Sequence, residues 1–173
     1  MQDGLSGHGP ASGRLAALHS YWLTKRAGEA VPLRGAIDPT EIPNLLPHIM
    51  LIDVEQPDQA PPRFRFRLTG TGLVDVFGQD PTGRYLDEPG WCRDADALLV
   101  PLRQAVALAA PVASAGRLAW DNGASVDIEW LFLPLGAGGA AVTIILAGAD
   151  FSSPSLQYPA GEPRIELTTA AEG

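Results

Sequence analysis

Residues 63–68 alternate between basic and apolar side chains, and this stretch most constrains what the chain can fold into. A period of two is typical of a β-strand with two unlike faces. The predicted apolar face carries Phe64, Phe66 and Leu68, and the predicted basic face carries Arg63, Arg65 and Arg67. We therefore expect a sheet that covers a core on one side and presents a row of guanidinium groups on the other.

Glycine residues divide the chain directly after this strand. Gly70 and Gly72 end the alternation, and an apolar segment at helical spacing follows over residues 73–77. Gly78 ends that segment, and residues 80–83 have the sequence of a tight turn, with proline second and glycine fourth. The sequence therefore predicts a strand, a short helix and a turn in close succession.

Length and charge restrict the classes of protein. The chain has 173 residues, enough for one domain, and a net charge of −8, which argues against binding to nucleic acid or to an anionic membrane. A single cysteine, Cys92, excludes a disulfide within the chain and fits a reducing compartment. The N-terminus does not read as a signal peptide, and no apolar run has the length of a membrane helix. We expect a cytoplasmic protein.

A first helix is predicted after a flexible tail over residues 1–13. Ser12 is suited to cap it, and an apolar stripe recurs at spacings of three and four. The stripe consists of Leu15, Leu18, Tyr21 and Trp22. Two interpretations stay open: the stripe packs on its own domain, or it joins two copies of the protein.

The remaining elements predict an α+β domain over residues 14–150. Strands are expected over 48–54, 63–69, 112–120, 125–134 and 140–147, and further helices over 38–46, 73–77 and 91–110, with Pro101 kinking or splitting the last. Two strands, helices and then three consecutive strands favour an antiparallel sheet with helices on one face. Residues 151–173, rich in proline, serine and alanine, are expected to be a flexible tail.

The order of these elements and several local motifs resemble a bacterial PAS-domain family. The matching pieces are Tyr21-Trp22, Asp38-Pro39, Ile42-Pro43, Leu46-Pro47, residues 63–71, Gly78, Thr82-Gly83-Arg84 and Leu133-Pro134-Leu135. The resemblance covers roughly residues 14–150. It implies a five-stranded antiparallel sheet with helices on one face, an N-terminal helix, and a sensory or interaction role.

The resemblance also implies how such a protein works. We expect a stand-alone, non-enzymatic signalling module, a homodimer that relays a signal by binding a partner protein. Two alternatives stay open: a receptor for a small apolar ligand held between sheet and helices, and, less favoured, a small α+β enzyme. The residues that would line the pocket, or equally a filled core, are Phe64, Phe66, Leu73, Phe77, Leu98, Leu102, Ile128, Trp130 and Ile144.

No cofactor, metal or catalytic residue is predicted. Flavin-binding members of the PAS class carry Asn-Cys-Arg before the long helix, whereas this chain has Trp91-Cys92-Arg93. Residues 91–110 contain no histidine to ligate haem, and the scattered histidines have no metal-ligand spacing. Asp75, Asp80, Asp87 and Glu88 read as caps and turns rather than as paired catalytic carboxylates.

The arginine row, Arg63, Arg65 and Arg67, has two interpretations. It forms solvated or surface ion pairs, Asp53 of the neighbouring strand being a candidate, or it is part of an interface with an acidic partner or a second copy. Asp127 and Glu129 are further candidates, although the resemblance places their strand away from this one.

Overall fold

The computed structural model describes residues 9–152 and 157–168. Residues 1–8, 153–156 and 169–173 lie outside the described part, and with them most of the predicted N-terminal tail and the ends of the predicted C-terminal tail. Within the described residues the predicted α+β fold with an antiparallel sheet is confirmed.

The sheet holds the five predicted strands and one more. Its strand order is β2-β1-β5-β4-β3-β6, and every neighbouring pair is antiparallel. The strands are β1 (Ile49–Glu55), β2 (Arg63–Thr69), β3 (Val112–Ala119), β4 (Ser125–Gly136), β5 (Val142–Phe151) and β6 (Arg164–Leu167). The continuously apolar β5 is central, between β1 and β4, because only a strand covered on both faces avoids exposing such a run.

Two helices and a short turn cover one face of the sheet, called here the inner face. They are α2 (Thr71–Phe77), a 3-10 turn over Ala95–Leu98 and α3 (Leu99–Leu108). The main core lies between them and the sheet, where Phe64, Phe66 and Trp130 are each at most 1% exposed. Among the described residues no helix has the length and apolar character needed to cross a bilayer.

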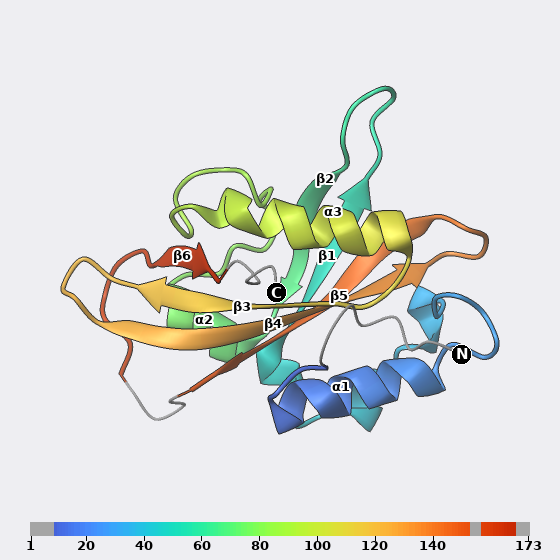
Figure 1. Ribbon diagram of the computed structural model, residues 1–173, viewed down its shortest axis with the longest axis horizontal. Coiled ribbons are helices and arrows are strands. Elements are labelled where there is room, and N and C mark those ends of the chain that lie inside the picture. The colour runs from blue at the N-terminus through green and yellow to red at the C-terminus, as the bar shows by residue number, and fades with distance from the viewer. Residues whose placement is uncertain (1–8, 153–156, 169–173) are drawn as a thin grey trace, which may run out of the picture.

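The first helix, α1 (Gly13–Thr24), covers the opposite, outer face, so the sheet lies between α1 and α3 (Figure 1). Leu15, Leu18 and Trp22 are each 1% exposed and pack on β4 and β5. The indole Nε1 of Trp22 donates a 2.9 Å hydrogen bond to the Pro134 carbonyl oxygen. At Gly148 an added Cβ would lie 2.6 Å from Leu18 Cδ2, so glycine lets the helix approach β5 closely.

The apolar stripe of α1 is therefore used within its own chain. Tyr21 completes it: its hydroxyl accepts a hydrogen bond from Asp38 N at 2.9 Å and lies 2.7 Å from Glu41 Oε2. Because Leu15, Leu18 and Trp22 are buried within one chain, the structure favours the interpretation that the stripe packs on its own domain. A role of this stripe in joining two copies stays a prediction.

Prolines shorten two of the predicted helices. The segment expected as a helix over 38–46 consists of 3-10 turns at Pro39–Glu41 and Leu46–His48, because Pro43 and Pro47 interrupt any longer run. The segment expected over 91–110 is divided into the 3-10 turn and α3. Pro101 lies in the first turn of α3, where its missing N–H removes no hydrogen bond from the helix.

A β-bulge makes the predicted direction of the Leu68 side chain wrong. The register of β1 against β2 shifts between Leu51 and Ile52, so Leu68 lies opposite Leu51 while Phe66 lies opposite Ile52. Leu68 consequently joins the outer face and is 45% exposed, whereas strict alternation predicts it beside Phe64 and Phe66. An extra residue in one strand reverses the alternation beyond it, and the sequence carries no sign of it.

The predicted C-terminal tail contains the sixth strand. Residues 164–167 pair with residues 116–119 of β3, and Ile165 is 2% exposed in the inner core. Arg93 N donates to Pro163 O at 2.8 Å, which ties the strand's entry to the segment before α3. Polar and apolar residues alternate over Arg164, Ile165, Glu166 and Leu167, which is typical of a strand. The prediction of a flexible tail rested instead on the proline, serine and alanine content of the surrounding residues.

The seating of α1 gives a stability test. We expect Leu18→Ala to lower the free energy of unfolding by about 3 kcal/mol, since it leaves a cavity between α1 and the sheet. Ser20→Ala, on the exposed side of the same helix, is the matched control and should change the value by less than about 0.5 kcal/mol. Urea titration followed by fluorescence measures both, and equal losses would contradict the seating.

Candidate functional site

The inner face, where the sequence places a pocket, is filled by aromatic rings in contact. The Trp91 ring lies edge-on to Phe66 and to Phe77, with centroid distances of 4.8 and 5.1 Å. Phe77 stacks on Trp130 at 6.4 Å, and Trp130 stacks on Phe132 at 6.1 Å. Edge-to-face and stacked ring pairs at these distances pack favourably, so aromatic side chains fill this part of the interior.

Eight of the nine predicted pocket residues lie in this inner core, and Ile144 does not. Ile144 faces the outer face with Leu146, whereas its neighbour Ile145 faces the inner core. The apolar run of β5 has no alternation, so the sequence could not assign its two faces. The eight that come together are Phe64, Phe66, Leu73, Phe77, Leu98, Leu102, Ile128 and Trp130.

Trp91 contacts two other rings of this cluster, Phe66 and Phe77, and was not among the predicted pocket residues. It is fully buried, and its Nε1 donates a 3.0 Å hydrogen bond to the Leu86 carbonyl oxygen. It lies between elements, in a stretch of turns and bends where no periodicity assigns a buried face. Only its type, a large aromatic residue, could have indicated burial.

Cys92 is a buried thiol beside the entry to β6. It is 4% exposed, and its Sγ lies 3.1 Å from the Pro163 carbonyl oxygen, to which the thiol donates. Burial raises the pKa of Cys92 well above the ordinary range, and the nearby carboxylate of Glu162 acts in the same direction. The sulfur is therefore a buried, neutral thiol at physiological pH.

The arginine row lies on the outer face of β2, at the end of the sheet that α1 leaves uncovered. Arg67 Nε lies 2.7 Å from Asp53 Oδ1, which confirms the predicted pairing with the neighbouring strand. Arg63 pairs with Asp87 at 3.3 Å and stacks over the Tyr85 ring at 3.7 Å. These three arginine side chains remain exposed, so their ion pairs contribute little to stability.

Arg65 differs from its two neighbours in the row. Its Nε donates a 3.1 Å hydrogen bond to the Gly83 carbonyl oxygen, and no carboxylate of the described residues forms an ion pair with it. The segment of residues 83–86 runs along the free edge of β2, with Phe66 N donating to Arg84 O at 2.9 Å. The edge of β2 is thus covered while its outer face is open.

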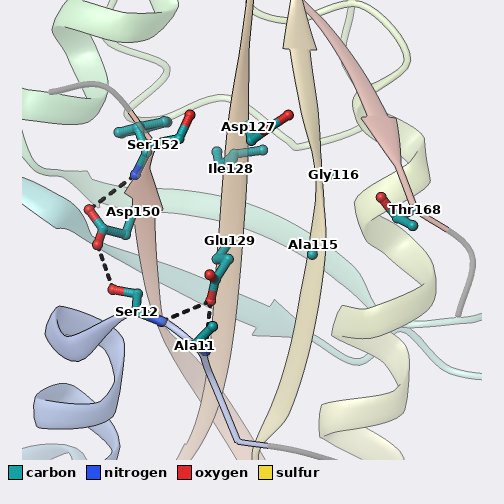
Figure 2. Close-up of a pocket in the computed structure, with 11 residues that line it drawn as sticks. Ala11, Ser12, Ala115, Gly116, Asp127, Ile128, Glu129, Asp150, Ser152 and Thr168 are labelled. Carbon is teal, nitrogen blue, oxygen red and sulfur yellow. Dashed lines mark hydrogen bonds between the residues drawn. The ribbon is translucent and has the colours of Figure 1, made fainter.

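A groove lined by carboxylates lies at the start of α1 (Figure 2). Glu129 Oε2 accepts hydrogen bonds from Ala11 N at 3.1 Å and Ser12 N at 3.2 Å. Asp150 accepts from the Ser12 hydroxyl and pairs with Arg14. Carboxylates at a helix N-terminus satisfy its unpaired N–H groups, so this groove holds α1 in place.

Neither Asp127 nor Glu129 contacts the arginine row. Glu129 binds the start of α1, and Asp127 pairs across strands with Arg117 at 3.6 Å. These carboxylates lie on β4, which is separated from β2 by β1 and β5. Among the described residues no group of three or more His, Cys, Asp or Glu side chains could hold a metal ion.

The antiparallel sheet, with strands in the order β2-β1-β5-β4-β3 and helices over its inner face, has the architecture of a PAS domain. The chain belongs to this family, since a family model described as a PAS domain matches residues 11–148. It is therefore a PAS sensory domain, of a family whose members are generally signalling modules rather than enzymes. No curated protein matches the chain.

Three solved structures of light-oxygen-voltage proteins are similar to the chain. A light-oxygen-voltage domain studied with a flavin analogue is 15% identical, with a TM-score of 0.45, over 66% of this chain and 83% of that one. The light-state aureochrome domain is 15% identical, with a TM-score of 0.43, over 66% and 88%. An RNA-binding light-oxygen-voltage receptor is 20% identical, with a TM-score of 0.44, over 71% of this chain but 36% of the receptor.

The burial of Cys92 predicts low reactivity. In the folded protein we expect iodoacetamide to alkylate Cys92 about a hundredfold more slowly than a free thiol, because only local opening exposes a buried neutral thiol. Ser20→Cys, made with Cys92→Ala, supplies an exposed thiol on α1 as the matched control. Mass spectrometry against time measures both rates, and similar rates in the two variants would overturn the assignment.

Proposed function

We propose that this protein is a non-enzymatic PAS sensory module that relays a signal by binding a partner protein, and that its interior holds neither flavin nor haem. One observation carries the proposal. The inner space between sheet and helices is occupied by the protein's own aromatic rings, which contact one another from Phe66 through Trp91 and Phe77 to Trp130. A signal is then transmitted by surface contact rather than by a resident chromophore.

Flavin, an analogue of which was used in the study of one similar structure, does not fit the residues present. A flavin ring needs polar side chains inside its pocket, and none of the described polar or charged residues is fully buried. The Cys92 thiol donates a hydrogen bond to Pro163 O and is held in its neutral form beside β6. No histidine lies between residues 91 and 110, so the same interior offers no haem ligand from α3.

The outer face of β2 is the surface we propose for the partner. It presents Arg65, which forms no ion pair with a carboxylate of the described residues, between two arginines that are each paired once. Leu68 adds an apolar side chain that is 45% exposed. An acidic protein segment with an apolar anchor complements this surface, and a second copy of the chain is the alternative occupant.

A small apolar ligand in the inner core is the second candidate function. One atom favours it: Trp130 Nε1 is buried without a hydrogen-bond partner among the described residues. An unsatisfied buried donor costs about 1–3 kcal/mol, which a ligand acceptor would recover. Such a ligand would have to displace rings that already pack together.

The cofactor part of the proposal is tested by the absorption spectrum of the purified protein. We expect aromatic absorption near 280 nm and no band at longer wavelength, because no pocket residue is suited to a flavin or a haem. Addition of riboflavin phosphate to the protein, followed by gel filtration, should leave the spectrum unchanged. A retained visible band would contradict the cofactor-free interior.

The partner surface is tested by site-specific crosslinking in the source cells. A photoreactive amino acid at Arg65 should give an adduct whose crosslinked segment is acidic, and at Arg117, exposed at the other end of the outer face, it should not. With the identified segment in purified form, Arg65→Glu should weaken binding about tenfold, since it reverses one charge. A crosslink to a second copy, or equal adducts at both positions, would overturn the proposal.

A further inference from the structure

A cavity lies on the outer face of the sheet, on the side opposite to the inner core. It has a volume of about 210 Å³ and lies between the sheet and residues 25–48, which join α1 to β1 and are called here the connector. Most of the residues that line it are apolar and buried, and two of them, Leu68 and Pro39, are exposed. The lining residues are Arg34, Ile37, Pro39, Ile42, Leu46, Ile49, Leu51, Leu68 and Leu146.

The β-bulge of β2 helps to form this cavity. Because the bulge turns Leu68 outward, its side chain faces the same side as Leu51 and Ile49 of β1. Across the gap, Ile37 and Ile42 of the connector are each 6% exposed. The cavity is therefore bounded by two strands on one side and by turns rich in proline on the other.

One charged residue lines this otherwise apolar space. Arg34 Nε is buried and has no hydrogen-bond partner among the described residues. All of the residues that line the cavity are described, and none of them is acidic. A buried guanidinium N–H without an acceptor is costly, and an anion bound beside it would satisfy it.

We propose that this outer cavity binds a small carboxylate with an unbranched or lightly branched apolar tail. The carboxylate accepts a charge-assisted hydrogen bond from Arg34 Nε, and the tail packs against Ile42, Leu51 and Leu68. At about 30 Å³ per water-sized group, the cavity holds about seven such groups, which is below the size of a drug-like pocket. A five-carbon acid such as pentanoate has the matching number of heavy atoms.

The alternative occupant, an apolar side chain of a partner protein, fits the cavity less well. It would fill the apolar walls but would leave Arg34 Nε buried and unsatisfied, and more completely cut off from water. A carboxylate satisfies both the walls and the donor. This inference does not depend on the partner surface proposed above, although Leu68 belongs to both.

The cavity is connected to α1 through the same connector. Glu41 of the connector pairs with Lys25 at 2.6 Å, and Tyr21 contacts both Asp38 and Glu41. Pro39 and Ile42, which line the cavity, are immediate neighbours of these contacts in the chain. A ligand that holds the connector against the sheet would therefore also hold the C-terminal end of α1.

The experiment is an NMR titration of the full chain with pentanoate, followed through methyl groups. We expect shifts at Ile42, Leu51 and Leu68 and none at Leu73 in the inner core. Pentanamide, which has the same shape without the charge, should bind at least about tenfold more weakly. Arg34→Gln should weaken pentanoate binding by about tenfold and leave pentanamide unchanged, whereas the exposed Arg65→Gln should change neither.

A second variant keeps the proposal falsifiable if Arg34→Gln does not fold. Leu68→Trp, at an exposed position, should fill the mouth and abolish the pentanoate shifts. The proposal is overturned if pentanamide binds as tightly as pentanoate, if Arg34→Gln or Leu68→Trp binds pentanoate normally, if the shifts fall on Leu73, or if no shift occurs. Equal binding of the amide would point instead to an apolar side chain as the occupant.

Discussion

The burial of β4 and β5 on both faces is the constraint on which the rest of this structure depends. Their inner side chains pack beneath α2 and α3, and their outer side chains pack beneath α1. A helix of 12 residues is marginal by itself, so α1 is held by Leu18 and Trp22 and by the carboxylates at its start. The middle of the sheet, residues 130–136 of β4 and 144–149 of β5, is therefore buried on both faces within one chain.

Covering the middle of the outer face leaves its two ends with different surfaces. At the β1–β2 end the arginine row is exposed beside Leu68, whereas at the β3–β4 end Arg117 and Asp127 pair with each other. A protein of net charge −8 thus concentrates three of its arginines on one strand. Attraction of acidic groups is confined to that end, and the remaining acidic surface repels them.

Periodicity predicted best the strands that have one polar face, which are β2 and the first half of β4. The alternation in β2 and β4 assigned Phe66 and Trp130 to the core correctly, and the cap at Ser12 was found from residue type. The misplaced residues are those whose direction depends on pairing: Leu68 beyond a bulge, and Ile144 in an apolar run. Register is a property of two strands, so a single strand's sequence does not contain it.

The candidate sites likewise contain residues that sequence periodicity could place and residues that only the folded structure could place. The burial of Trp91 could not be predicted from its neighbours, because the turns around it have neither helical nor strand periodicity. Its ring nevertheless helps to fill the inner space. Arg34 could not be singled out, because an arginine in a connector is ordinarily exposed. Its significance arises only when the turns bring it over Ile49 and Leu51, beside a strand whose bulge supplies Leu68. Non-local packing, rather than any motif, makes that arginine a ligand-binding candidate.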